Sequence, residues 1–592
     1  MNITDQLTLE LGKYQTNFQS RLKLLNEQNF VERFWNKDES LWKDKDATAF
    51  MGWLTVVDKM IEALPAIEDF SQCKAVSGFK HVVLLGMGGS SMTPLVFQQT
   101  FKKSGKGLKL LVIDTTDPKT IQNVEKEINI AKTLFVVSSK SGNTAEIMAL
   151  YDYFFDRVFK IKEDRAGENF IAITDQNSPL TGIAKRRQFR KVFINFSDIG
   201  GRFSALSYFG IVPAALMGID VRQLLERART MIKSCGPEAP VYENPGVTLG
   251  AAIAEMAMQG CDKLTYLTPP NMSCFGLWLE QLIAESTGKE EKGILPVNGT
   301  PLIELETYGK DRFFVSMQMA SKQNDIEKLK ELIAAEFPVI NILIQDPLDI
   351  GQEFFRWEIA TAVAGAILHI NPFDQPNVQE SKTKTNQLLK KVELHGSLPE
   401  MEPVHIDNNL HYYVSPVENN IIDEKLDGKL LLENFLALSK TGNYIALQVY
   451  LPQEAEVEKY LLDIQLTLQR SLHIPVTVQF GPRYLHSTGQ YHKGGPNNGF
   501  FIQFTGNSSE SLAIPGQTYT FGLLKRAQAI GDMQALIEHN KKVMLVDTGK
   551  DYINGLNAFK QIVKKLKPLK KNIQKKSTTY PNQEENVLSL AV

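Results

Sequence analysis

The chain has 592 residues, more than one hydrophobic core usually organises, so we expect two to four domains. Its hydrophobic content of 43% and charged content of 22% are typical of a soluble globular protein. The longest apolar helical candidate, Ile359–Leu368, is too short to cross a bilayer. A net charge of −2 argues against nucleic-acid binding.

The chain start and the cysteines indicate a cytoplasmic protein. The sequence MNITDQLTLELGKYQ lacks the basic and apolar regions of a secretory signal. Four scattered cysteines, with no C-x-x-C pair, fit reduced thiols rather than disulfides or a zinc site. They are Cys73, Cys235, Cys261 and Cys274.

Composition and periodicity divide the chain into five expected segments. Residues 1–75 are predicted to be helical, with Trp35, Trp42 and Trp53 as packing anchors. Residues 76–235 and 236–395 are predicted to form two α/β units of the doubly wound class. Residues 396–550 form a C-terminal α/β extension, and residues 551–592 a helix followed by a lysine-rich tail, which we expect to be disordered.

Two strand–loop–helix segments in the first unit favour phosphate binding. Val82–Met92 is an apolar run that ends in GMGGSS, whose glycines allow backbone N–H groups to approach an anion. Ser91 stands where a dinucleotide fingerprint needs its third glycine. Leu134–Glu146 repeats the arrangement and could otherwise be ordinary helix capping. Its loop carries Ser139, Lys140, Ser141 and Thr144.

A third motif, Gly276–Lys292, carries the best candidate for proton transfer. Gln281 and Glu285 lie one helical turn apart and so share a helix face. The Ser-Thr-Gly run that follows allows the helix to break, and a carboxylate at such a junction can shuttle a proton. Arg202, in GGRFSAL, could stabilise a developing negative charge or form an ion pair. The turn-rich Ile370–Lys382 leads into a helix that carries Lys382.

Taken together, these segments closely resemble the glucose-6-phosphate isomerase family. The stretches LEQLIAESTGK, FFRWEIATAVAGAIL and NPFDQPNVQESK resemble the isomerase half of bifunctional transaldolase/glucose-6-phosphate isomerases, and the resemblance runs from about Trp42 to about Leu536. It implies an α/β fold with two sugar-isomerase (SIS) domains, each a doubly wound parallel sheet. A separate transaldolase barrel of roughly 250 residues has no room beside them.

The resemblance also implies roles for individual residues. Glu285 would move the proton between C1 and C2, Arg202 would stabilise the enediolate, and Gln281 would contact the substrate. Lys382 would assist ring opening. The phosphate would be held by Ser90, Ser139, Lys140, Ser141 and Thr144. No metal or cofactor is needed. The expected partner is a hexose phosphate, with neither nucleic acid nor membrane, in a possible homodimer.

The ring-opening histidine departs from the family order. Relatives carry it between the catalytic glutamate and the F-D-Q segment, where this chain has only His369. The best histidine motif, LHSTGQYHKG at Leu485–Gly494, comes later and makes His486 the candidate. We expect His369 to be a packed residue at a helix end, and His492 is a second candidate.

An internal repeat could explain this order, although strand–helix–strand recurs in every α/β protein. The pattern of Phe313–Met319, Ile326–Ala335 and Val339–Gln345 is repeated by Tyr444–Leu451, Glu454–Arg470 and Val476–Phe480. We therefore expect the extension to duplicate part of the second domain.

Three functional readings remain open. The first is an isomerase of glucose 6-phosphate and fructose 6-phosphate. The second is a sugar-phosphate-binding regulator without turnover, and the third is an isomerase that also accepts mannose 6-phosphate.

Overall fold

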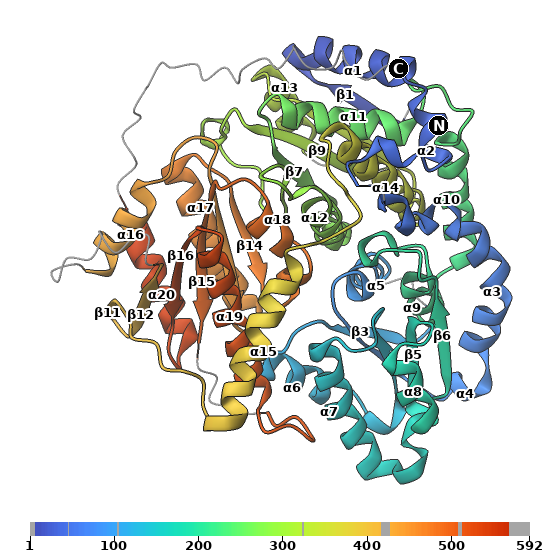
Figure 1. Ribbon diagram of the computed structural model, residues 1–592, viewed down its shortest axis with the longest axis vertical. Helices are drawn as coiled ribbons and strands as arrows, with labels where there is room; N and C mark the ends of the chain where they lie inside the picture. Colours follow the sequence, from blue (N-terminus) through green and yellow to red (C-terminus); the bar gives the residue numbers. More distant parts are fainter. Residues whose placement is uncertain are drawn as a thin grey trace.

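The computed structural model describes residues 6–44, 46–102, 106–321, 325–415, 427–506 and 512–566. Within them the chain forms three α/β units, each built on one sheet (Figure 1). This confirms the predicted fold class. No helix in these ranges is long and apolar enough to cross a membrane. The lysine-rich tail expected to be disordered lies outside the described residues from 567 onward.

The first unit contains a five-stranded, wholly parallel sheet in the order β3-β2-β4-β5-β6. The strands are β2 (His81–Gly86), β3 (Lys109–Ile113), β4 (Thr133–Ser138), β5 (Phe170–Asp175) and β6 (Lys191–Asn195). They alternate with α5 (Gly89–Thr100), α6 (Pro118–Glu127), α7 (Ala145–Lys162) and α8 (Pro179–Arg186). Strands β2 and β4 are almost wholly buried because the sheet is covered on both faces, which explains their unbroken apolar runs.

The second unit has the sheet order β1-β10-β9-β7-β8. Its parallel strands are β7 (Lys263–Leu267), β8 (Leu295–Val297), β9 (Arg312–Met319) and β10 (Val339–Ile344). The main helices are α11 (Pro245–Met258), α12 (Ser273–Thr287), α13 (Ile326–Ala334) and α14 (Ile350–Ile367). Helix α14 is buried along its whole length, which accounts for its apolar sequence.

The N-terminal segment is not purely helical, in contrast to the prediction. Helices α1 (Gln15–Glu27), α2 (Phe30–Trp35) and α3 (Val56–Gln72) are preceded by strand β1 (Leu7–Glu10), which pairs antiparallel with β10. The alternation Leu-Thr-Leu-Glu has the period of a strand. Trp42 and Trp53 are buried as expected, and Trp35 donates a hydrogen bond to the carbonyl of Cys235 at 2.7 Å.

The third unit has the sheet order β11-β12-β16-β15-β13-β14. The strands are β11 (His405–Asp407), β12 (Leu410–Val414), β13 (Tyr444–Tyr450), β14 (Val476–Phe480), β15 (Gly499–Thr505) and β16 (Lys542–Asp547). Helices α16 (Gly428–Ala437), α17 (Ala455–Leu472), α19 (Phe521–Glu538) and α20 (Tyr552–Lys564) complete it. Helix α15 (Val378–His395) runs between this unit and the rest of the molecule and packs on α19 (Figure 1).

The second and third units share one topology. Numbered within each unit, four parallel strands lie in the order 2-1-3-4, and an antiparallel strand joins the fourth: β1 on β10, and β12 on β16. The strand order thus agrees with a duplication. However, the sequence-based prediction of which segments correspond in the two units is wrong. Topology matches β13–α17–β14 to β7–α12–β8, not to β9–α13–β10. Strand–helix–strand patterns recur within each unit, so pattern alone could not select the correct pair.

The third unit meets the others through apolar clusters and through polar contacts, and one face of its sheet carries buried glutamines. Gln479, Gln448 and Gln503 are paired in register across β14, β13 and β15, and residues paired in this way point to the same face of the sheet. All three are buried. Polar contacts link the unit to the first two, including Arg483 to Asp114. Further contacts join Lys525 to Asp117 and Gln465 to Thr300.

Candidate active site

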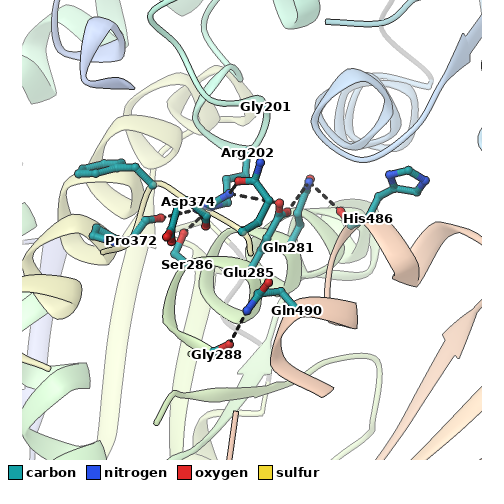
Figure 2. Close-up of polar contacts among 12 residues, drawn as sticks. Gly201, Arg202, Gln281, Glu285, Ser286, Gly288, Pro372, Asp374, His486 and Gln490 are labelled. Atoms are coloured by element: carbon teal, nitrogen blue, oxygen red, sulfur yellow. Dashed lines mark hydrogen bonds and ion pairs between the residues drawn. The ribbon is translucent and has the colours of Figure 1, made fainter. Parts of the chain in front are cut away.

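Glu285 lies in a buried polar cluster at the end of α12, as the motif predicts. Its Oε1 pairs with Nη1 of Arg202 at 3.2 Å, and its Oε2 accepts a hydrogen bond from Nε2 of Gln281 at 3.1 Å. Glu285 is 7% exposed and Arg202 2%. We call Glu285, Gln281 and Arg202 the Glu285 cluster (Figure 2). Arg202 therefore forms the ion pair that was its structural alternative.

The loop after α14 fixes the guanidinium of Arg202. Its Nη2 donates to the carbonyls of Pro372 and Asp374 at 2.5 and 2.8 Å, and its Nε donates to Oγ of Ser286 at 2.7 Å. Lys289 holds the same loop through Oδ1 of Asp374 at 2.6 Å. Burial, together with the charge of Arg202, lowers the pKa of Lys289 to about 7. The guanidinium of Arg202 is held by the loop carbonyls and by Ser286, and a cation fixed in this way is preorganised to face a developing oxyanion.

The expected phosphate loop lies between β4 and α7. Oγ of Ser139 contacts Oγ1 of Thr144 at 3.1 Å and accepts a hydrogen bond from the backbone N–H of Gly142. Thr144 is the N-cap of α7, and Ser141 is exposed in the loop. Hydroxyls at a helix N-terminus form a suitable anion site.

Two members of the expected phosphate set differ in their surroundings. Ser90 lies in the first turn of α5, and its carbonyl accepts a hydrogen bond from Ser138, which joins the two predicted loops. Lys140 is already paired: its Nζ contacts Oδ2 of Asp175 at 2.5 Å and the carbonyl of Ser197 at 3.1 Å.

A glycine of the first motif has a further role. Gly88 has φ of +54°, and a Cβ there would lie 3.0 Å from Nε2 of Gln281 and 3.1 Å from the carbonyl of His486. Only glycine accommodates both the backbone angle and this close approach. The GMGGSS loop therefore lets the first unit contact α12 and the histidine turn.

His486 reaches the site from its own chain. It lies in a 3-10 turn, η13 (Arg483–His486), and its carbonyl accepts a hydrogen bond from Gln281 at 2.9 Å. Its ring points away from Glu285 (Figure 2), and Nε2 lies 3.1 Å from Oε1 of Glu146. Glu146 is in the first turn of α7, directly after the phosphate loop. The ring is therefore near the expected phosphate position rather than beside Glu285.

Lys382 joins the same group through its charge. Burial of Glu146 alone would raise its pKa, but the nearby charges of His486 and Lys382 hold the pKa of Glu146 below its usual range. We call His486, Glu146 and Lys382 the His486 cluster. An acid–base pair of this kind can move protons on a sugar ring.

The two rival histidines lie elsewhere. His369 follows the end of α14, as expected, but it is exposed with φ of +52°, so the expectation of a packed residue is wrong. The backbone turns into the left-handed region there. His492 is buried in the third unit, where its Nδ1 contacts Gln448 at 3.1 Å.

Sequence reasoning missed Glu146 as a functional candidate. It stands in the quoted segment SSKSGNTAE, but an acid in the first turn of a helix is ordinary dipole compensation. Its burial and its contact with a residue 340 positions away become visible only in the fold. Lys289, in the ESTGK motif, had a clearer signal, since it follows the helix that carries Glu285.

A buried carboxylate set against a guanidinium, hydroxyl-rich loops at the ends of parallel strands and an imidazole–carboxylate pair define a class of enzyme. They fit an isomerase of phosphorylated sugars built on doubly wound units. Residues 46–300 match the family model for phosphoglucose isomerase. This match includes the Glu285 cluster and the phosphate loop, while His486 and Lys382 lie beyond it.

Relatives with assigned names agree. A probable glucose-6-phosphate isomerase of Methanococcus maripaludis is 25% identical over 64% of this chain and 94% of its own length. A glucose-6-phosphate isomerase of Carboxydothermus hydrogenoformans is 29% identical over 52% of this chain and 79% of its own length.

Solved structures show the same fold. A hypothetical protein of Thermus thermophilus aligns with a TM-score of 0.55 at 22% identity, over 64% of this chain and 99% of its own. A glucose-6-phosphate isomerase of Chlamydia trachomatis gives a TM-score of 0.51 at 20% identity, over 65% of this chain and 87% of its own. The chain is similar to the phosphoglucose isomerase family over these residues and to its named relatives, as its motifs predict. The likeness to bifunctional transaldolase/isomerases stays a prediction.

Proposed function

We propose that the chain is an aldose–ketose isomerase that interconverts glucose 6-phosphate and fructose 6-phosphate. The observation that carries this proposal is the Glu285 cluster, in which one carboxylate is held between Gln281 and Arg202. The names of the relatives support the same reaction. The cytoplasmic location and a homodimer stay predictions.

Binding begins at the phosphate. The loop from Ser139 to Thr144 offers hydroxyls and the N-terminus of α7 to the phosphate group. Lys140 is paired with Asp175, which supports a role in holding this loop, and its direct contact with the phosphate stays a prediction. The loop hydroxyls and the dipole of α7 would then supply most of the attraction for the phosphate group.

Ring opening would follow at the His486 cluster. The proton of the anomeric hydroxyl leaves as the bond between the anomeric carbon and the ring oxygen breaks, and the ring oxygen takes up a proton. His486, which contacts Glu146, and Lys382 are the groups that could exchange these protons. Glu146 acts through His486 and so orients it.

Isomerisation would take place at Glu285. Its carboxylate removes the C2 proton of the open aldose, which leaves a cis-enediolate. It returns this proton to C1, while the hydroxyl proton on O2 passes to O1. Arg202 supplies positive charge where the oxygen gains its negative charge, and its five protein contacts keep it in place. Gln281 orients the base through Oε2.

A coupled assay tests the proposal. Purified protein is given fructose 6-phosphate, and glucose 6-phosphate is detected with its dehydrogenase. Turnover that requires Glu285 supports the isomerase. Tight binding of fructose 6-phosphate with no turnover would support the regulator instead. Turnover of mannose 6-phosphate in the same assay would establish the broader isomerase.

A further inference from the structure

Asp532 is a buried carboxylate that the proposed mechanism leaves unused. It lies on α19 in the third unit and is 0% exposed. Its Oδ1 accepts hydrogen bonds from Nζ of Lys493 at 2.8 Å and Oγ of Ser381 at 2.9 Å. Its Oδ2 accepts from the hydroxyl of Tyr484 at 2.8 Å and from Nε2 of Gln503 at 3.3 Å. Four donors therefore converge on one carboxylate.

Two of these donors are neighbours of the proposed ring-opening residues. Ser381 directly precedes Lys382 on α15, and Tyr484 belongs to the 3-10 turn η13 that carries His486. The two segments are far apart in the sequence. Asp532 therefore fixes the start of α15 and the turn η13 relative to each other.

One turn earlier on α19, Gln528 holds Glu146, the remaining member of the His486 cluster. Its Nε2 donates to Oε1 of Glu146 at 2.8 Å, and its Oε1 accepts from Oγ1 of Thr116 at 2.8 Å. Residues 528 and 532 are four apart, so they share a face of α19. We call them the α19 pair.

The energetics argue against a purely stabilising role. The pKa of Asp532 tends upward through burial, but Lys493, Tyr484 and Ser381 lower it below its usual range, so the carboxylate is ionised. Replacing a buried ion pair by apolar residues is often neutral or stabilising. Where such a pair specifies geometry, its replacement disturbs the arrangement of the neighbouring residues rather than lowering the stability of the fold. The lysine–aspartate pair here is fully buried, with side chains 1% and 0% exposed.

We propose that Gln528 and Asp532 are positioning residues for ring opening: from one face of α19 they set the placement of Glu146, His486 and Lys382. This inference rests on the proposed isomerase function. Neither residue touches the Glu285 cluster by any contact found among the described residues, so proton transfer between C1 and C2 would not depend on them.

The experiment separates the two steps with two substrates. Fructose 6-phosphate is cyclic and must be opened. 5-Deoxyfructose 6-phosphate lacks the oxygen that closes the ring, so it is open-chain at full hexose length. Its conversion in heavy water is followed by NMR as deuterium enters C1. Wild-type turnover of both substrates is measured first; no turnover of fructose 6-phosphate would refute the proposed function itself.

For Asp532→Asn we expect kcat on fructose 6-phosphate to fall about ten- to hundred-fold, the usual effect of misplacing a reacting group by roughly 1 Å. KM and the rate on the open-chain substrate should change less than about threefold, since the phosphate loop and the Glu285 cluster are intact. Gln528→Leu should show the same split. Equal losses on both substrates, or no loss on either, would overturn the inference.

A double variant and a control remove the ambiguity of folding. Asp532→Leu with Lys493→Met deletes both buried charges, so Tm should hold or rise while fructose 6-phosphate turnover is still lost. A double variant with unchanged turnover would refute positioning. Glu353→Gln is the matched control, because Glu353 and Arg356 form a fully buried pair on α14 away from both clusters. It should lower Tm without altering the ratio of the two rates.

Discussion

The Glu285 cluster and the His486 cluster are assembled in different ways. Glu285 and Gln281 come from one helix, and their partner Arg202 comes from a short glycine-rich turn. The His486 cluster draws on the start of α7, the turn η13 and the start of α15, each from a different part of the chain. The spacing of Gln281 and Glu285 is kept as long as α12 is folded, and Arg202 joins them from a turn 83 residues before Glu285. Distributed assembly of the His486 cluster keeps its geometry only when three units are docked.

The largest expected effect breaks the local cluster. Glu285→Gln should reduce kcat by about 10²–10⁴-fold, because removing a general base typically has that effect. Binding of fructose 6-phosphate, measured by calorimetry, should stay close to wild type since the phosphate loop is untouched. A kcat near the wild-type value in this variant would show that another group moves the proton.

The distributed cluster predicts a substrate-dependent loss. His486→Ala should slow turnover of cyclic fructose 6-phosphate by about 10²-fold, the low end for a lost acid–base group. Open-chain 5-deoxyfructose 6-phosphate should be spared, as measured by NMR. His369→Ala is the control and should leave both rates unchanged, because His369 is exposed beyond α14. If His369→Ala impairs turnover instead, the ring-opening role moves to that residue.

Mixing two impaired variants tests whether the Glu285 cluster and the His486 cluster of one chain act together. His486 contacts Glu146 of the same chain, so Glu285→Gln mixed with His486→Ala should stay at the sum of the separate activities. Activity rising toward a quarter or more of wild type would mean that chains exchange their third units. The measurement is the specific activity of equimolar mixtures after refolding together.

A change in the phosphate loop should affect binding more than chemistry. Ser141→Asp places a carboxylate in an exposed loop that is expected to hold the phosphate, so KM should rise at least about tenfold, or ~1.4 kcal/mol. Ser141→Asn, similar in size but neutral, should raise KM less. An unchanged KM in the aspartate variant would place the phosphate elsewhere.

The smallest effect concerns the stability of the third unit. Burial lowers the pKa of His492 to about 3 from an ordinary value of 6.5. The neutral ring therefore contributes stability that is present above pH 6.5 and is lost as pH falls toward 3, at up to about 1.4 kcal/mol per pH unit. Tm measured from pH 7 to pH 4 should fall less steeply in His492→Gln. Parallel curves would contradict this burial effect.

The sequence predicts the Glu285 cluster better than it predicts the His486 cluster. Glu285, Gln281 and Arg202 were predictable because spacing on a helix and glycine-flanked turns are local signals. The strands and helices of the proposed repeat lie within a few residues of their expected bounds. Which segments of the two units correspond was not predictable, since strand order is a long-range property. Glu146, Gln528 and Asp532 carry no local signal, because their partners come from other segments: Glu146 and Gln528 are 382 residues apart, and Ser381 is 151 residues from Asp532.

The long separation between Glu146 and His486 also matters while the protein is being made. They are 340 positions apart, so at about 5–20 residues per second the ribosome needs roughly tens of seconds to supply the second after the first. During that interval Glu146, which has its charged partners on later segments, stands beside a finished phosphate loop without them. A nascent chain that has passed Glu285 would thus hold its base and its phosphate loop before it could open a sugar ring.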